Sequence, residues 1–91
     1  MRIIYGTHAL VRMFQRHIKV EKVRDVLTRG ETIEDYSDDM PYPSRLILGW
    51  RWRRPLHVVA VFNEIENEFI VITVYEPDPT LWSADFRKRK T

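Results

Sequence analysis

Two stretches in the second half of the chain, 56–62 and 68–75, are apolar on both of their alternating faces. In the first stretch, one face carries Leu56, Val58, Ala60 and Phe62, and the other carries Val59 and Val61. An antiparallel sheet with one face in water would alternate apolar and polar residues. We therefore expect both faces to be covered, one by helices and the other by the C-terminal tail, a second subunit or a protein partner. Trp82 and Phe86 are the tail's candidates for that role.

The rest of the chain predicts an α+β fold. Residues 2–5 read as an extended N-terminal segment. A helical apolar spacing predicts helices at 8–16, with Thr7 as N-cap, and at 20–29, with Gly30 as the stop. Alternation predicts strands at 32–36, 45–52, 56–62 and 68–75, with a loop at 37–44 and turns at 53–55 and 63–67. The expected architecture is two N-terminal helices on an antiparallel sheet of about four strands, followed by a basic C-terminal tail.

Composition narrows the class of protein. The chain has 91 residues and no cysteine, which indicates one domain over 1–91 and excludes disulfides and thiolate chemistry. Within it, we expect the helices at about 8–29, the sheet at about 31–76 and the tail at 77–91. No apolar run approaches the roughly 20 residues of a membrane helix, and the N-terminus lacks a signal-peptide core. We expect a cytoplasmic protein that does not contact membranes, and the scattered histidines predict no metal or cofactor.

Basic residues gather in three places although the net charge is only +2. On the first helix, His8, Arg12 and Arg16 follow a spacing of four, which puts them in one row. The others are Arg51, Arg53 and Arg54 and the basic tail that contains Arg87 and Arg89, and such patches can bind phosphates. Two interpretations of the helix row stay open. The acidic segment 31–39 could neutralise it as a structural network, or a phosphate could bind it.

Two further side chains are candidates for chemistry. His57 lies in an apolar strand, where a satisfied buried histidine is the commoner outcome, yet imidazole exchanges protons near neutral pH. Tyr75 lies at the end of the last strand and shares a face with Thr73; such a tyrosine can stack on a base or donate a proton, or only pack its ring. Glu76, next to it, is either a base or the partner of a nearby arginine.

The order of motifs resembles that of a bacterial protein family, domain of unknown function 4258. The resemblance runs from about Thr7 to Lys90. It is carried by Thr7-His8-Ala9-x-x-Arg12-Met13-x-x-Arg16-x-Ile18, Val23-x-x-Val26-Leu27, Pro55-Leu56-His57-Val58-Val59 and Ile72-Thr73-Val74-Tyr75-Glu76-Pro77-Asp78-Pro79-x-x-Trp82-x-x-Asp85-Phe86-Arg87-x-Arg89. His17 and Lys19 depart from the family pattern, which usually has Gly and Ser there. The helix–helix–sheet order is also similar to that of RelE-like and ParE-like toxins, which cleave mRNA, often on the ribosome, or inhibit gyrase, and which antitoxins neutralise.

That similarity implies a hypothesis of a metal-independent ribonuclease. In it, His57 or His8 transfers protons, Arg12 and Arg16 hold the scissile phosphate, and Tyr75 positions the nucleotide. Arg51, Arg53, Arg54, Arg87 and Arg89 contact the nucleic-acid backbone. The implied partners are RNA or the ribosome and a cognate antitoxin, and a homodimer is a further option. The alternative is a non-catalytic module that binds a protein or nucleic acid, with His8, Arg12 and Arg16 structural; DNA binding by the basic tail is a third reading.

Overall fold

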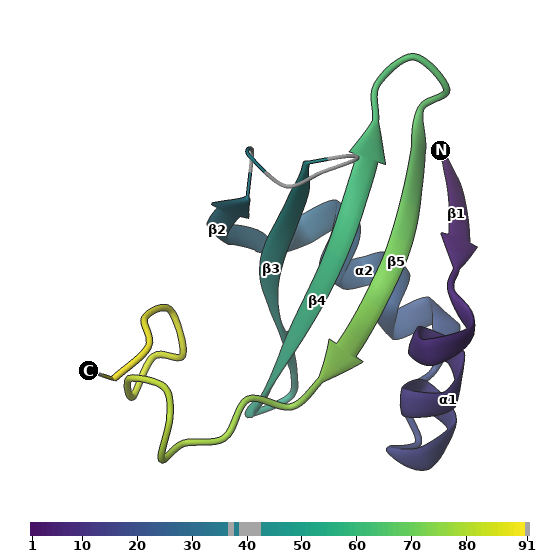
Figure 1. Ribbon diagram of the computed structural model, residues 1–91. Coiled ribbons are helices and arrows are strands. Elements are labelled where there is room, and N and C mark those ends of the chain that lie inside the picture. The colour runs from purple at the N-terminus through teal and green to yellow at the C-terminus, as the bar shows by residue number, and fades with distance from the viewer. Residues whose placement is uncertain (37, 39–42, 91) are drawn as a thin grey trace.

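The computed structural model describes residues 1–36, 38 and 43–90 and has the α+β architecture, with two helices and a five-stranded mixed sheet (Figure 1). The elements in chain order are β1 (Arg2–Tyr5), α1 (Thr7–Gln15), α2 (Val20–Arg29), β2 (Glu31–Tyr36), β3 (Ser44–Arg51), β4 (Arg54–Asn63) and β5 (Glu68–Tyr75). Most of the expected loop at 37–44 lies outside the described residues. None of the helices in the described part of the chain is long and apolar enough to cross a bilayer.

The sheet differs from the expected four-stranded antiparallel one. Its strand order is β1-β5-β4-β3-β2, and β1 pairs with β5 in parallel, with Arg2 opposite Glu68 and Tyr5 opposite Val71. The other pairs are antiparallel. β1 and β5 can pair in parallel because they are not joined by a tight turn. Both helices and the strands β2, β3 and β4 connect them and return the chain to β1. The N-terminal segment is therefore an edge strand, and the fully antiparallel prediction was wrong.

One face of the sheet packs against both helices. α1 lies against β5, while α2 contacts β3 and β4. The residues buried in this layer come from α1, α2, the turn between them and the inward positions of three strands: Ala9, Met13, Ile18, Val23, Val26, Leu27, Ile47, Leu56, Val58, Ala60, Phe69, Val71 and Val74. Burying about a dozen apolar side chains, each worth roughly 1.5–3 kcal/mol, makes this layer the main source of stability.

The opposite face is covered at one end by residues 77–90, which we call the strap. It closes on itself through backbone hydrogen bonds from Ser83 to Lys88 and from Lys90 to Leu81, of 2.7 and 2.8 Å. Trp82 is buried, with its ring 4.5 Å from that of His57, and Phe86 meets Trp50 edge to face. Of the three covers considered for the second face, the tail supplies the one at this end, with Trp82 buried and Phe86 partly buried.

Local boundaries show where the sequence pattern was misleading. Gly6, not Thr7, is the N-cap of α1, and no side chain caps that helix. Gly30 ends α2 as expected, but its backbone is extended (φ −72°, ψ 173°). Its role is close packing, because an added Cβ would overlap the Val26 carbonyl oxygen and lie 2.7 Å from the Leu48 carbonyl oxygen. The predicted strand at 45–52 runs one residue too far, since β3 stops at Arg51 and Trp52 lies in the turn.

Candidate nucleic-acid interface

The row of His8, Arg12 and Arg16, called the cationic row below, lies on the outer flank of α1. Ala9 and Met13 of this helix point into the core and are 0% and 3% exposed. The residues of the cationic row lie outside this buried face. His8 and Arg16 are exposed and Arg12 is partly buried. Among residues 1–36, 38 and 43–90, no carboxylate forms an ion pair with any of the three.

Two carboxylates of the acidic segment pair with the strap. Glu31 binds Arg87 of the strap at 2.9 Å, and Glu34 lies 3.7 Å from Arg89 and accepts a hydrogen bond from Tyr36. Glu31 and Glu34 thus form ion pairs with the strap and not with the cationic row. The segment's Asp39 lies outside the described residues. The two arginines of the tail therefore act as anchors of the strap on β2.

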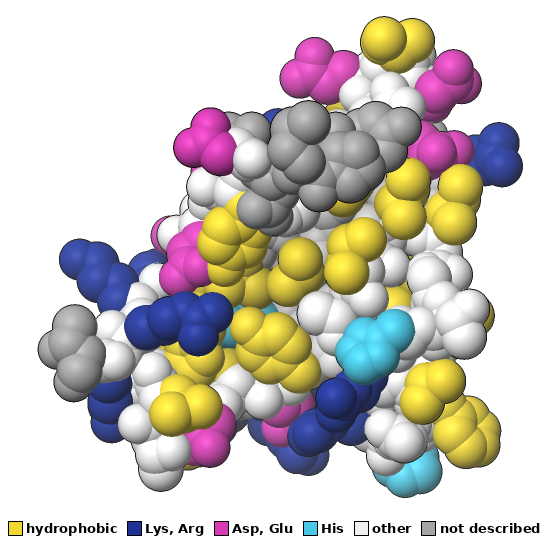
Figure 2. Space-filling model, viewed as in Figure 1, with side chains coloured by type: hydrophobic (Ala, Val, Ile, Leu, Met, Phe, Trp, Pro, Cys, Tyr) yellow, Lys and Arg dark blue, Asp and Glu magenta, His cyan; other side chains and the backbone are white. Residues whose placement is uncertain are grey.

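Beside the end of the cationic row lies a polar depression that we call the polar hollow. It encloses about 380 Å³ and is lined by Gln15, Arg16, Arg54 and Glu76. These residues come from the end of α1, the start of β4 and the residue after β5, which the fold brings to one edge of the molecule. In Figure 2, dark blue Lys and Arg side chains and a cyan His side chain gather in this region, near the lower end of β5 and α1.

Glu76 organises the arginines around the polar hollow. Its carboxylate accepts hydrogen bonds of 2.9 Å from both Arg51 and Arg54. Arg51 also donates to the backbone carbonyl of His17, at 3.2 Å, which ties the β3 end to the turn after α1. Two guanidinium groups share one carboxylate, and Arg16 adds a third cation, so the hollow keeps an excess of positive charge. Such a site suits an anion that can accept several charge-assisted hydrogen bonds.

His57 lies in a different environment. Its side chain is 0% exposed, its Nε2 is 3.0 Å from the carbonyl oxygen of Phe86, and its Nδ1 is 3.3 Å from the hydroxyl of Tyr75. Because a carbonyl only accepts, Nε2–H donates to Phe86, and Nδ1 accepts from Tyr75. Burial lowers the pKa of His57, and burial also raises the pKa of Tyr75. This arrangement holds a neutral imidazole beneath the strap.

Arg53 is the last of the residues that the sequence predicted for the site. Arg53 is exposed in the turn between β3 and β4, beside Trp52, and no described acid pairs with it. The structure thus brings Arg16 and Arg54 together at the polar hollow and links Arg51 to Glu76 and to the His17 carbonyl, whereas His57 and Tyr75 contact each other. Gln15 was not among the residues predicted for the site, and Trp52 was expected in a strand. The arginine-partner reading of Glu76 is confirmed.

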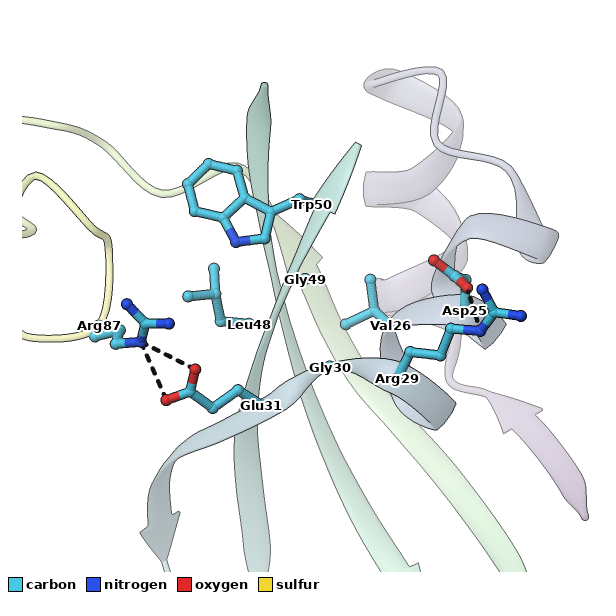
Figure 3. A pocket seen from close by; sticks show the side chains of 9 residues that line it. All are labelled: Asp25, Val26, Arg29, Gly30, Glu31, Leu48, Gly49, Trp50 and Arg87. Atoms are coloured by element: carbon cyan, nitrogen blue, oxygen red, sulfur yellow. Dashed lines mark hydrogen bonds and ion pairs between the residues drawn. The ribbon is translucent and has the colours of Figure 1, made fainter. Parts of the chain in front are cut away.

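A second hollow, of about 230 Å³, lies between the end of α2, the start of β2 and the strap (Figure 3). Its charged groups are already paired. Asp25 lies 3.5 Å from Arg29 on one side, and Glu31 binds Arg87 on the other. Because both pairs are satisfied, this hollow offers a ligand less net charge than the polar hollow. Nor does any group of three or more His, Asp or Glu residues within the described ranges form a metal site.

Comparison with known proteins agrees with the motif pattern. The family model described as "Domain of unknown function (DUF4258)" matches residues 5–76. The chain belongs to this family. The match includes the cationic row, the β3–β4 turn and Glu76, and it ends where the strap begins, whereas the motif resemblance ran on to about Lys90. No curated protein and no solved structure matches the chain significantly.

Proposed function

We propose that this DUF4258 protein is an RNA-binding module whose phosphate contacts come from α1 and the start of β4. The observation that carries the proposal is the polar hollow, where Arg16 and Arg54 meet from elements distant in sequence. Arg12 and His8 extend the line of donors one and two helical turns away. A row of cations without acidic partners matches the repeating phosphates of a nucleic-acid strand.

Glu76 favours RNA over DNA as the ligand. A carboxylate beside the phosphate-binding arginines repels phosphate oxygens, yet it accepts a hydrogen bond from a 2′-hydroxyl, which DNA lacks. The amide of Gln15, which also lines the hollow, can donate to a phosphate or a base edge. The hollow therefore combines cations for the backbone with an acceptor for the ribose.

The ribonuclease hypothesis requires a proton-transfer group beside the bound phosphate. His57 does not meet this requirement, because both of its ring nitrogens are bonded and its side chain has no exposure. His8 is exposed in the cationic row, and Glu76 lines the hollow, so a cleavage mechanism would depend on them. RNA binding needs neither proton transfer nor His57, and it is the function that we put forward.

The test is fluorescence anisotropy with a labelled RNA of about a dozen nucleotides, titrated at salt concentrations from about 50 to 300 mM. Arg16→Ala and Arg54→Ala should each weaken binding several-fold and should each lower the slope of log affinity against log salt by about 0.7. Arg29→Ala is the matched control, since Arg29 is an exposed helix arginine paired with Asp25, away from the polar hollow. Equal affinities for all three variants and the wild type would refute the proposal.

Two additional measurements distinguish RNA binding from DNA binding and from RNA cleavage. A DNA oligonucleotide of the same sequence should bind more weakly than the RNA, and Glu76→Gln should keep the affinity for RNA, because an amide oxygen still accepts a hydrogen bond. If DNA binds as well as RNA, the role assigned to Glu76 is wrong. Electrophoresis of the RNA after incubation reports cleavage directly, and intact RNA would reject the ribonuclease hypothesis while leaving the binding proposal in place.

A further inference from the structure

The turn between β3 and β4 presents an aromatic side chain to solvent. Arg51 and Arg54 are the last paired residues of the two strands, so Trp52 and Arg53 form a two-residue turn. The side chain of Trp52 is 95% exposed. A tryptophan normally loses a large apolar area from water on folding, and this one keeps nearly all of its area accessible.

The backbone at Trp52 is also unfavourable for a tryptophan. Its φ is 60°, and Arg53 is not in the positive-φ region. A positive φ at the first central residue alone is the pattern of a type II′ turn, a position that glycine normally occupies. A bulky residue there is an outlier, and strained residues of this kind concentrate at binding sites. Neither local conformation nor packing accounts for a tryptophan at this position.

The surroundings indicate which ligand an exposed indole would meet. Arg53 is exposed beside it, and Arg54, which lines the polar hollow, is two residues away. Two residues of extended chain span at most about 7 Å, so a phosphate on Arg54 places an adjacent nucleotide within reach of the indole. An aromatic face next to a cationic track is the arrangement by which proteins hold unpaired nucleotides.

We propose that Trp52 stacks on an unpaired base and that the nucleic acid bound at the polar hollow is single-stranded. This inference rests on the proposed RNA binding and adds the class of substrate to it. In a duplex, each base is stacked on its neighbours and paired, so an indole at the tip of a turn has no free base face to cover. Contacts from the arginines alone would not distinguish single strands from duplexes, because both carry phosphates.

The experiment compares an unstructured RNA of about a dozen nucleotides with an RNA duplex of equal length. Trp52→Ala should weaken binding of the single strand by about fivefold to a hundredfold, the range seen when one stacking partner is removed. Trp52→Tyr should restore most of the affinity. Since Trp52 carries no charge, the salt dependence should stay as in the wild type. Affinity for the duplex should not change.

Trp52→Gly provides the control for folding. Glycine suits the positive φ, so this variant should melt at or above the temperature of the wild type while binding single-stranded RNA as weakly as Trp52→Ala. Wild-type affinity in Trp52→Ala, or an equal loss for single strand and duplex, overturns the stacking role. If Arg16→Ala still weakens RNA binding in that case, the proposed function survives without it.

Two other results would also overturn the inference. If the wild type binds no RNA, the proposed function fails and the stacking role fails with it. A tryptophan flanked by arginines could also dock at a lipid surface. Sedimentation with vesicles of anionic lipid tests this directly: binding to vesicles that Trp52→Ala abolishes, with RNA binding unchanged, would assign the turn to a membrane surface instead.

Discussion

The buried His57 should make the folded protein less stable in mild acid. In the unfolded chain, an imidazole takes up a proton near its ordinary pKa of 6.5. In the folded protein, burial lowers the pKa of His57, and its Nδ1 already accepts a hydrogen bond from Tyr75. Below about pH 6.5 the unfolded state therefore binds more protons than the folded state, so the free energy of unfolding falls as the pH falls.

The size of this effect has an upper limit. A group that titrates only in the unfolded state changes the free energy of unfolding by at most about 1.4 kcal/mol for each pH unit below its unfolded pKa. Between about pH 7 and pH 5 the loss is then at most about 2 kcal/mol. The full loss requires His57 to stay neutral, which its 0% exposure and its contacts under the strap favour.

Urea unfolding followed by circular dichroism at about pH 7, 6 and 5 measures this loss. His57→Gln keeps a donor and an acceptor but does not titrate, so its stability should fall less steeply over this range than that of the wild type. His8→Gln makes the same change of side chain at an exposed position and serves as the matched control. Carboxylates titrate in all three proteins and cancel in the comparison. If His57→Gln loses as much stability as the wild type, the argument from burial is refuted.

Two substitutions test the packing on the two faces of the sheet. Trp82→Ala should lower the free energy of unfolding by about 3–5 kcal/mol, because the strap's buried indole covers His57; a loss below about 1 kcal/mol in urea unfolding would mean that the strap contributes little. Gly49→Ala should cost about 1–3 kcal/mol, because the added Cβ overlaps Val26, lying 3.0 Å from its Cβ. Combining it with Val26→Ala should cost less than the sum of the two single losses, and strict additivity in a thermal melt would contradict the overlap.

Much of the architecture could be predicted from the sequence, because the spacing of apolar residues follows the pattern of burial in helices and strands. The spacing of Val23, Val26 and Leu27 fixed a helix that the structure has at Val20–Arg29. Apolar residues on both faces of the last strands required cover, and Trp82 was a correct candidate for it. β1 was read only as an extended segment, since four residues hold too little alternation to reveal a partner far along the chain. Parallel pairing depends on the path of the chain through both helices to β2 and back across β3 and β4 to β5, which no local pattern records.

The candidate site was less predictable because its geometry depends on distant contacts. His57 is sealed by Phe86, which is 29 residues further along, so its neighbours in β4 could not indicate whether it meets solvent. Trp52 was extended into a strand because its alternation with Trp50 fits, and only the register of Arg51 with Arg54 places it in the turn. Gln15 carries no sequence signal for ligand binding, and its role emerges only from the polar hollow.

The distribution of ion pairs explains why α1, with so few basic residues, should dominate nucleic-acid affinity. Arg87 and Arg89 lie beside Glu31 and Glu34, so these two arginines hold the strap on β2. A strap held only by its apolar residues would leave those carboxylates near the sheet edge, where they would repel phosphates. Because Arg87 and Arg89 neutralise these carboxylates, Glu31 and Glu34 do not weaken the positive potential around the cationic row. The ion pairs of Arg87 with Glu31 and of Arg89 with Glu34 thus have a structural role, whereas Arg12 and Arg16 are among the described cations that form no ion pair.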